Sequence, residues 1–422
     1  MVRAGTPVAV GERLGEGAQG VVYAARLGGA SYAVKWYRAV PKPAELRDSI
    51  AALIDIGCPH PAFIWPIDLV VSDEIPGFGY LMPRLDPAFG SLGELLGRTS
   101  SPPFGVIIDI GLRLEAAFEA LHGAGLCYRD INAKNLWVNT EKAEVAIIDN
   151  DNVGTDDGDV FVWGTLSFMA PEVVRREKFP SSHTDLHSLA VLLFYLFAHG
   201  HPLEGTRTDS AYPAVMSGKS ESELAVRTFG LEPVFVFDPR DRSNPPAPGD
   251  PVLTWWPIYP WFFRALFEQA FTSGLTNPLT GRVPEGIWRR ALIRLGDSVS
   301  RCRCQAAVFY DPDDPGLRCW NCRQVPDRPP LLQLPGGTMV LSEGAAITSH
   351  HLHRDRDHRH VIGVVEAHPT QPGAVVLRNV SHDDWTMTPD GEAAVTVPPQ
   401  RRLGVRNMVI DFGSARGRIY TD

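Results

Sequence analysis

Hydrophobic and polar positions follow successive patterns along the chain. From Gly11 to about Ile75, β-branched and aromatic runs such as GVVYAARL, SYAVKWY and FIWPIDLVV alternate with turn residues, which predicts short strands. Between them, PAELRDSIAALIDI has helical spacing, and its acidic residues Asp48 and Asp55 point away from the apolar face. That face consists of Leu46, Ile50 and Leu53. We therefore expect a small sheet accompanied by one helix.

Helical spacing dominates from Ser91 onward. It recurs in SLGELLGR, VIIDIGLRLEAAFEALHGAG, HSLAVLLFYLFAHG, YPWFFRALFEQAFTSG and GIWRRALIRLGDSVSR, which predicts a larger, mostly helical unit ending near Arg301. A long Pro-rich excursion, Thr206 to Trp255, interrupts this unit. The longest apolar run, Leu189 to Ala198, is about half of a membrane span and predicts a buried helix, so we expect no transmembrane segment.

The last part of the chain changes pattern again. The stretch QVPDRPPLLQLPGG is typical of a Pro-rich linker, and the short β-type runs that follow alternate with turn residues without a convincing helix. We therefore expect a linker over residues 326–333 and a small all-β domain over residues 334–422. With 422 residues, an α+β protein of two or more domains is expected.

Composition narrows the location and the class of partner. A hydrophobic fraction of 44% and a charged fraction of 21% are ordinary for a globular protein, and a net charge of -9 argues against binding to nucleic acid or to an acidic membrane surface. The N-terminal stretch MVRAGTPVAVGERLGEG lacks the apolar core of a signal peptide. We expect a cytoplasmic protein.

The cysteines are unevenly placed. Cys58 and Cys127 stand alone, whereas SRCRCQAAVFYDPDDPGLRCWNCRQ holds one C-x-C and one C-x-x-C pair, formed by Cys302, Cys304, Cys319 and Cys322. Four thiolates on two short knuckles close a tetrahedral structural Zn²⁺ site, so we expect a zinc ribbon over residues 299–325. An iron–sulfur cluster and two disulfides are the alternatives, but a cytoplasmic location disfavours disulfides and no redox-partner motif accompanies the cluster.

Two features near the N-terminus are suited to holding phosphates. In LGEGAQGVV, Gly15, Gly17 and Gly20 let a hairpin backbone approach phosphate oxygens, although a glycine-rich turn without a ligand is the alternative. A strand pair surrounds the motif, which disfavours a dinucleotide fold. Lys35 lies in the apolar strand YAVKWY, where its charge needs a partner. It is either an edge lysine or the lysine that orients α- and β-phosphates.

Two later stretches add oxygen groups. In CYRDINAKNLWV, the Asp130 carboxylate can accept a proton from an attacking hydroxyl, and the Asn135 amide oxygen can bind Mg²⁺. In AIIDNDNVG, Asp149 follows an apolar strand and offers a second oxygen ligand. Either stretch alone is a common turn sequence, whereas the occurrence of both favours a site that binds a metal ion and a nucleotide.

These stretches together resemble the bacterial eukaryotic-like (Hanks-type) serine/threonine protein kinases. LGEGAQGVV, AVK, YRDINAKN, IIDND and GTLSFMAPE occur in the order and approximate spacing of that family, from about residue 8 to about residue 298. The resemblance implies a bilobal fold, with an N-lobe over residues 1–83 and a C-lobe over residues 84–298. It also implies transfer of phosphate from ATP to protein hydroxyls, including autophosphorylation, with Mg²⁺ or Mn²⁺ as cofactor.

The resemblance also implies residue roles. Asp130 orients the hydroxyl, Lys134 replaces the basic residue usually found at the position of Asn132, and Glu45 is the acidic partner of Lys35. Met82 lies at the gate of the base pocket, and the Leu85 backbone N–H reads the base. The implied nucleotide-binding residues are Gly15, Gly17, Gly20, Val22, Ala33, Lys35, Met82 and Leu85, and the implied magnesium ligands are Asn135 and Asp149.

Besides Asn132, the chain departs from the family pattern in three places. Tyr128 replaces a supporting histidine, and Asp149-Asn150-Asp151 replaces Asp-Phe-Gly, so the phenylalanine that many kinases flip is missing. Glu45 lies in a first helical turn, where an acid can simply favour the helix dipole. A second alignment places Ser49 at the family's glutamate position and leaves the partner of Lys35 to be found elsewhere.

Later landmarks agree with the resemblance. It implies that Glu172 pairs with Arg282 and that Asp185 braces the catalytic loop, and a contact from Thr165 to the catalytic aspartate favours serine and threonine substrates. Arg129 pairs either with a phosphorylated Thr155 or with a loop already ordered by its acids, and we expect the second. Those acids are Asp156, Asp157 and Asp159.

The tail offers less chemistry. SHHLHRDRDHRH holds His350, His351, His353, His358 and His360; metal or phosphate binding is one interpretation, and a solvated loop of alternating charges is the one we favour. The β pattern resembles a forkhead-associated sandwich without that family's phosphothreonine-binding signatures, so we expect an adaptor domain. The order of a kinase region, a four-cysteine cluster and a β domain resembles that of bacterial kinases encoded next to a metal-dependent phosphatase and a von Willebrand A-type protein. The resemblance implies that these two proteins are partners.

An active kinase is the function we expect. The alternatives are a pseudokinase scaffold that binds nucleotide and recruits partners, and a small-molecule phosphotransferase of the aminoglycoside type, which would not be expected to carry GTLSFMAPE. The tripeptide Asp411-Phe412-Gly413 matches the family's metal motif in letters only. It follows Asp130 far too late in the chain, so we expect a strand and turn there.

Overall fold

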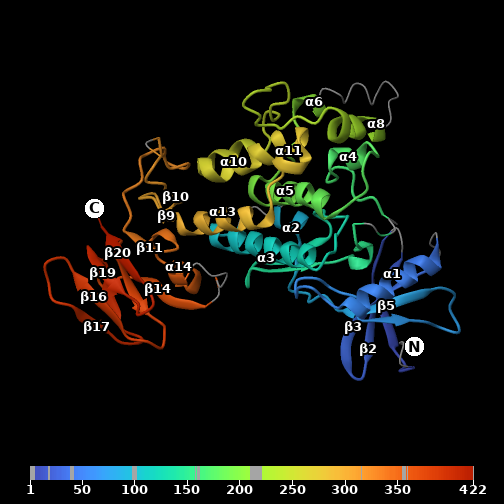
Figure 1. Ribbon diagram of the computed structural model, residues 1–422, viewed down its shortest axis with the longest axis horizontal. Coiled ribbons are helices and arrows are strands. Elements are labelled where there is room, and N and C mark those ends of the chain that lie inside the picture. The colour runs from blue at the N-terminus through green and yellow to red at the C-terminus, as the bar shows by residue number, and fades with distance from the viewer. Residues whose placement is uncertain are drawn as a thin grey trace. The chain divides into compact units, whose positions relative to one another are not determined.

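The computed structural model describes residues 5–17, 20–38, 42–96, 102–156, 158, 162–209, 221–314, 316–353, 358 and 360–421. The chain divides into two compact units. Unit 1 comprises Met1–Trp256 and Arg264–Arg289, and unit 2 comprises Pro257–Phe263 and Arg290–Asp422. Figure 1 shows a sheet with one flanking helix at one end of unit 1 and a group of helices at the other. Among the described residues, no helix combines the length and apolarity needed to cross a membrane.

The N-terminal sheet has five antiparallel strands in the order β1-β2-β3-β5-β4. They are β1 (Ala9–Glu16), β2 (Val21–Leu27), β3 (Ala30–Tyr37), β4 (Asp68–Val70) and β5 (Phe78–Pro83). Helix α1 (Pro43–Ile56) buries Leu46, Ile50 and Leu53, as its spacing predicts, and Leu46 and Ile50 share a core with Tyr37 and Phe78. The expected sheet with one helix is therefore confirmed.

The helical part of unit 1 is built around α3 (Phe104–Gly123) and α5 (Ser182–Ala198). Ser181 caps α5 with a reciprocal hydrogen-bonded capping box, and the run Leu189 to Ala198 is buried except at Tyr195, as predicted for a core helix. A small sheet in the order β6-β7-β8 lies beside α3. Its strands are β6 (Gly90–Ser91), β7 (Leu136–Asn139) and β8 (Glu144–Ile147).

Shorter helices complete this region. They are α2 (Leu92–Leu96), α4 (Pro171–Val174), α6 (Thr206–Asp209), α8 (Glu221–Val226), the π-helix η2 (Arg227–Leu231), α9 (Val252–Trp255), α10 (Trp261–Ala270), α11 (Ser273–Thr276), α12 (Pro278–Gly281) and α13 (Glu285–Asp297). The predicted Pro-rich excursion packs into the core, because Phe235 is buried against Phe194 and the buried Asn244 donates to the Leu203 and Val234 carbonyls. Residues 210–220 of the excursion lie outside the described part.

Unit 2 combines a small hairpin with two larger sheets. The hairpin pairs β9 (Val299–Arg301) with β10 (Ala307–Phe309), and the sheets have the orders β12-β11-β20-β19-β16-β17 and β13-β14-β15-β18. Both sheets contribute to one hydrophobic core, so they face each other as a sandwich. The strands are β11 (Leu331–Leu334), β12 (Gly337–Val340), β13 (Ala346–Thr348), β14 (Val361–Ala367), β15 (Val375–Asn379), β16 (Trp385–Pro389), β17 (Val395–Val397), β18 (Arg402–Gly404), β19 (Met408–Asp411) and β20 (Arg416–Tyr420).

Three features of unit 2 differ from the sequence prediction. The expected linker contains most of β11, whose Leu332 is fully buried, because the leucines after the proline pair enter the sandwich core. A short helix, α14 (Ser349–His353), lies in a region predicted to lack helices. His351 on α14 is 3% exposed, so this part of the histidine run is not the solvated loop that its charges predict.

Candidate active site and metal centre

The glycine hairpin joins β1 and β2. Gly15 pairs with Val22, and the Gly17 N–H donates to the Gly20 carbonyl at 2.9 Å. A Cβ at Gly20 would lie 2.5 Å from the Trp36 carbonyl oxygen, so only glycine fits there, whereas Gly15 and Gly17 border open space. The backbone of this hairpin is therefore accessible to an anion. Residues 18 and 19 at its tip lie outside the described part.

Lys35 lies inside the sheet with its charge enclosed. It is 5% exposed on β3, and its Nζ donates to the Asp149 Oδ1 at 3.1 Å and to the two Asp151 carboxylate oxygens at 2.9 and 3.0 Å. Burial alone would lower the pKa of Lys35, but the Asp151 and Asp149 carboxylates raise it above its ordinary value. Lys35 is thus a buried, paired cation and not an edge lysine.

The predicted acidic partner of Lys35 is not where the sequence suggests. The Glu45 carboxylate is 46% exposed and lies 3.9 Å from the Lys42 Nζ, one turn away on the solvent side of α1. In this structure Glu45 therefore does not pair with Lys35. The acids that contact Lys35 lie instead on the segment after β8, and α1 contributes Ser49 to the cavity that Asp151 also lines.

The predicted base-binding residues lie on β3 and after β5. Ala33 pairs with Met82 in the β3–β5 register, two residues from the pair formed by Lys35 and Tyr80. Because side chains two residues apart on a strand share a face, Ala33 and Met82 lie on the face that carries Lys35. Leu85 follows the end of β5 and is half-buried.

The loop from Cys127 to Asn135 holds Asp130 by several hydrogen bonds. The Thr165 hydroxyl donates to Asp130 Oδ1 at 2.8 Å, the Asn132 Nδ2 donates to the same oxygen at 3.0 Å, and the Asn135 Nδ2 donates to the Asp130 backbone carbonyl at 3.1 Å. Burial raises the pKa of the Asp130 carboxyl above its usual range. A carboxylate that is oriented in this way and partly desolvated is suited to accept a proton from a bound hydroxyl.

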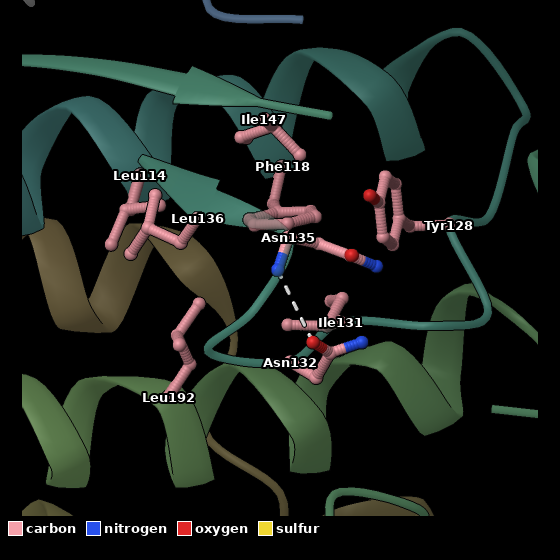
Figure 2. A pocket seen from close by; sticks show the side chains of 9 residues that line it. All are labelled: Leu114, Phe118, Tyr128, Ile131, Asn132, Asn135, Leu136, Ile147 and Leu192. Carbon is pink, nitrogen blue, oxygen red and sulfur yellow. Dashed lines mark hydrogen bonds between the residues drawn. The ribbon is translucent and has the colours of Figure 1, made fainter. Parts of the chain in front are cut away.

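Supporting residues tie this loop to the core. The Tyr128 hydroxyl donates to the Ile148 carbonyl next to Asp149, and Asp185 accepts the backbone N–H groups of Tyr128 at 2.5 Å and Arg129 at 3.0 Å. Figure 2 shows the packed floor beneath the loop, where a space of about 10 Å³ between α3, α5 and the loop is no larger than one water molecule. Lys134 on the same loop has an exposed side chain.

The segments that carry Asn135 and Asp149 lie side by side. The Ile148 N–H donates to the Asn135 carbonyl at 3.0 Å, which holds the two segments together, and the Asn135 Nδ2 is turned to Asp130. Asp149 has a left-handed backbone (φ 59°), unusual for a residue with a side chain, and its carboxylate is 46% exposed. The Asp149 carboxylate contacts Lys35, and carboxylate and amide oxygens are ligand types that suit a hard cation such as Mg²⁺.

The predicted ion pair of Glu172 with Arg282 is present, since the Arg282 guanidinium donates to the Glu172 carboxylate at 2.5 Å. The Arg129 guanidinium donates to the Thr155 carbonyl at 2.6 Å and the Gly158 carbonyl at 3.4 Å, so it holds the backbone of this loop. Of the loop acids, Asp157 and Asp159 lie outside the described residues.

A buried histidine makes the stability of this region depend on pH. His122 lies between the carboxylates of Asp185 (3.2 Å) and Glu285. Burial alone would lower the pKa of His122, but the hydrogen bonds with Asp185 and Glu285 raise it from its ordinary value of 6.5 to about 9. Because the folded pKa is the higher one, the stabilisation is complete below about pH 6.5 and is lost as the pH rises through about 9.

We therefore expect the free energy of unfolding to fall between about pH 6.5 and pH 9, by about 3 kcal/mol at most. Denaturant titrations across this range measure it. The variant His122→Asn should be less stable than the wild type at pH 6.5 and should lose most of this pH dependence. A wild-type curve that is flat across the range, or equal slopes in both proteins, would contradict the assignment.

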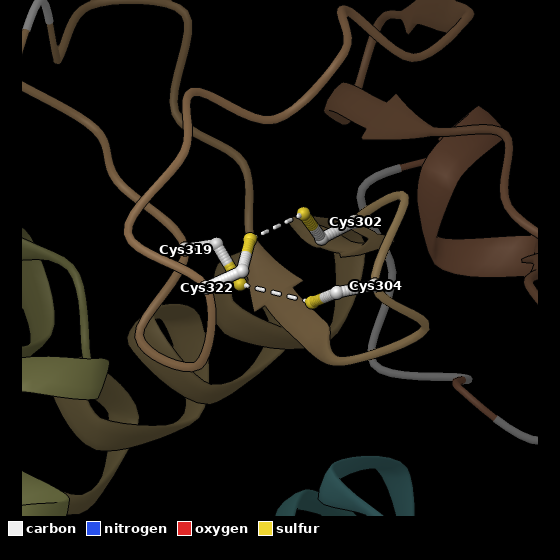
Figure 3. A group of neighbouring side chains, drawn as sticks. All are labelled: Cys302, Cys304, Cys319 and Cys322. Atoms are coloured by element: carbon white, nitrogen blue, oxygen red, sulfur yellow. Dashed lines mark hydrogen bonds between the residues drawn. The ribbon is translucent and has the colours of Figure 1, made fainter.

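The four clustered cysteines converge in unit 2 (Figure 3). The Cys302 and Cys322 Sγ atoms lie 3.6 Å apart, as do those of Cys304 and Cys319, and all four sulfurs lie within 4.8 Å of one another. Zn–S bonds of about 2.3 Å in a tetrahedron place sulfurs about 3.8 Å apart, so the set fits one Zn²⁺. The cysteines are not bonded to each other, and the space between them is too small for several irons. A hydrogen bond from the Ala306 N–H lowers the pKa of the Cys304 thiol to about 6, which favours a thiolate.

A second group of potential ligands has a different explanation. Asp297, His350 and His351 lie close enough to share an ion. However, the His351 Nδ1 accepts the Thr348 N–H at 3.0 Å, and its Nε2 lies 3.0 Å from the Asp297 carboxylate. Since an Nδ1 that accepts a backbone N–H leaves the ring proton on Nε2, this histidine is satisfied by hydrogen bonds. We interpret the group as structural.

Two buried residues have roles that the sequence pattern does not predict. Asp151 is 2% exposed and contacts both Lys35 and the Tyr37 hydroxyl, and Asn132 is 4% exposed and shapes the loop through Asp130, Lys134 and Asn135. The only signal in the sequence for Asp151 was a second acid two residues after Asp149. Asn132 was noted only as a missing lysine.

The sequence is similar to those of known protein kinases. A model described as "Protein kinase domain" matches residues 8–230. The rice (Oryza sativa subsp. japonica) CBL-interacting protein kinase 4 is 26% identical over 287 residues, which is 64% of this chain and 60% of that protein. A serine/threonine-protein kinase of Myxococcus xanthus is 29% identical over 165 residues, which is 36% of this chain and 29% of that protein. The chain spans less than two thirds of the length of these curated relatives.

Proposed function

The chain belongs to the protein kinase family, and on this basis we propose that it is an active ATP-dependent serine/threonine protein kinase. The observation that carries the proposal is the assembly of a paired Lys35, the Asn135 and Asp149 oxygen donors and a Thr165-bound Asp130 around one loop system. A protein that had lost catalysis would have no need to keep these polar groups together in a partly buried place.

The chemistry assigned to the chain's own residues is simple. Asp130 orients the substrate hydroxyl and accepts its proton, Lys35 and the glycine hairpin hold the nucleotide phosphates, and the exposed Lys134 is free to reach the transferred group. Bound Mg²⁺, held by Asn135 and Asp149, would supply neutralisation of phosphate charge. The contact between Thr165 and Asp130 supports serine and threonine as acceptors.

The remaining assignments complete the proposal. Residues 1–83 and 84–298 act as the two lobes, residues 299–325 as a ribbon that holds Zn²⁺, and residues 334–422 as a β-sandwich adaptor that recruits partners. The sandwich core and the cysteine geometry support the last two assignments. Protein substrates, a cognate phosphatase and a von Willebrand A-type protein are the partners we propose to test.

The proposal is tested by measuring which class of molecule accepts the phosphate. The purified chain is incubated with Mg-ATP and either a generic protein substrate or an aminoglycoside, with EDTA as control. We expect phosphoserine and phosphothreonine in protein, dependent on Mg²⁺, without phosphotyrosine or phosphorylated aminoglycoside. Nucleotide binding without any transfer would favour the scaffold function, for which the displaced Glu45 is the supporting observation.

We also predict that activity does not require phosphorylation of Thr155. Arg129 donates to the Thr155 and Gly158 backbone carbonyls, and the Asp156 carboxylate already accepts the Ser182 N–H at 2.7 Å and the Ser182 hydroxyl at 2.9 Å. Thr155→Ala and phosphatase treatment should therefore each leave the rate within about two-fold of wild type. If both treatments abolished activity, the loop would depend on phosphate.

A further inference from the structure

The strongest unexplained feature of the site is the environment of Asp151. Its carboxylate is almost fully buried, accepts two contacts from Lys35 Nζ at 2.9 and 3.0 Å, and accepts the Tyr37 hydroxyl. Burial raises the pKa of Tyr80, and the Asp151 carboxylate raises it further, which places a second tyrosine beside the same anion. A buried carboxylate is tolerated only when it is paired and hydrogen-bonded, and Asp151 satisfies both conditions.

Helix α1 does not provide this acid. A cavity of about 150 Å³ lies between α1 and the loop after β8, and it is lined by Asp151 on that loop and by Arg129 on the loop before β7. The α1 residues that line it are Ser49, Ala52, Leu53 and Ile56, none of which carries a carboxylate, and Glu45 lies one turn before Ser49 outside this lining. Glu45, the α1 acid that the sequence predicts as the partner of Lys35, lies near Lys42 instead.

We propose that Asp151 is the positioning residue that holds Lys35, in place of an acid on helix α1. The proposal rests on the kinase function proposed above. It assigns different roles to two aspartates on one loop: Asp151 stays with Lys35 and Tyr37 inside the lobe, whereas the half-exposed Asp149 is the one available to a cation.

The need for two aspartates follows from their contacts. If Asp149 were the only partner of Lys35, the ammonium group would compete with Mg²⁺ for the same carboxylate. Asp151 would remove this competition, because its contacts with Lys35 keep the ammonium group paired if Asp149 binds a cation. The segment itself is anchored, since the Asn150 Nδ2 donates to the Ile64 carbonyl at 2.8 Å and the Ile147 carbonyl at 3.0 Å.

A consequence is that the position of Lys35 is set by the metal-binding loop and not by α1. The glutamate that would otherwise link the helix to the lysine is replaced by Ser49, which borders the cavity. Movement of α1 should therefore have little effect on the lysine. Restoring an acid at position 49 should be able to substitute for Asp151.

The test uses Asp151→Asn, Ser49→Glu and the double variant in the full-length protein. Asp151→Asn should lower kcat/KM for ATP by about ten- to a hundred-fold, since misplacing a phosphate-binding group by about 1 Å has effects of that size. It should also raise the Mg²⁺ concentration needed for half-maximal rate, an effect that simple loss of packing would not produce. Adding Ser49→Glu should recover much of the rate, while Ser49→Glu alone and the exposed control Asp48→Asn should stay near wild type.

A second measurement tests the pairing of Asp151 with Lys35 independently of kinase activity. Unfolding of wild type, Lys35→Met, Asp151→Asn and their double variant forms a double-mutant cycle, and a clear coupling between the two positions is expected whether or not the protein transfers phosphate. If the wild type is inactive, the kinase function fails and the cycle alone decides the pairing. Wild-type kinetics and Mg²⁺ dependence in an active Asp151→Asn variant, or additive stabilities, would overturn the proposal. Increased activity of Asp151→Asn would also overturn the proposal, because it would show that the contact between Asp151 and Lys35 inhibits the protein.

Discussion

Replacing Asp130 with alanine should lower the rate of phosphate transfer by about 10²- to 10⁴-fold, the usual contribution of a positioned general base. The carboxylate is held by the Thr165 hydroxyl at 2.8 Å and the Asn132 amide at 3.0 Å, so its direction is fixed before substrate binds. Because the change removes a group that acts on the substrate hydroxyl and not on the nucleotide, KM for ATP should change little. Steady-state kinetics with a protein substrate measure both values.

The fold should survive this substitution. The loop is also held by backbone groups, since Asp185 accepts the N–H groups of Tyr128 and Arg129 and the Asn135 Nδ2 donates to the Asp130 carbonyl. A melting temperature close to that of wild type, with intact nucleotide binding, is the control for folding, and the exposed Asp48→Ala is the matched variant. A rate for Asp130→Ala within about three-fold of wild type would remove Asp130 from the mechanism.

Removing zinc should unfold the hairpin formed by β9 and β10. Four sulfurs within 4.8 Å of one another cannot remain as thiolates without a cation. The core of the hairpin is small, since Val308 packs among the cysteines and Phe309 packs against Tyr259. Structural zinc in small peptides contributes about 10–16 kcal/mol of apparent binding free energy, which is folding free energy for such a domain. Chelation or Cys304→Ser should therefore expose the backbone amides of residues 299–310 to rapid hydrogen exchange.

Metal analysis provides the control for this prediction. The wild type should carry about one zinc per chain, Cys304→Ser should carry much less, and Cys58→Ser should keep the wild-type content because Cys58 is exposed and far along the chain from the cluster. Purified protein with iron and visible absorption, or with neither metal and an intact hairpin, would contradict a structural zinc site.

Much of the site could be predicted because its residues lie on local patterns. The apolar spacing of α1, the buried run of α5 and the order of the glycine hairpin, Lys35, Asp130, Asn135 and Asp149 are all visible in sequence. The contacts of Thr165 with Asp130 and of Arg282 with Glu172 followed from family resemblance. These are cases where one local pattern or one known arrangement decides the structure.

The partner of Lys35 could not be predicted in this way. Asp151 lies 116 positions from Lys35, and nothing local distinguishes a buried acid from a turn-forming one. Glu45 was the better candidate by spacing, but its place in the first turn of α1 directs it to Lys42. β11 was missed for a similar reason, because two prolines before it look like a linker while its leucines are buried by strands that come much later in the chain.

We predict that Asp149 binds the catalytic metal and that the tripeptide Asp411-Phe412-Gly413 is structural. Asp411 ends β19, where its carboxylate accepts the Gly413 N–H at 2.9 Å and pairs with Arg416 at 2.6 Å, and Phe412 is 5% exposed against Trp385. The most direct measurement compares Mg-ATP-dependent phosphate transfer by wild type, Asp149→Ala and Asp411→Ala. We predict transfer by wild type and Asp411→Ala and a loss in Asp149→Ala; no transfer by wild type, or retained transfer by Asp149→Ala with loss in Asp411→Ala, would contradict the claim.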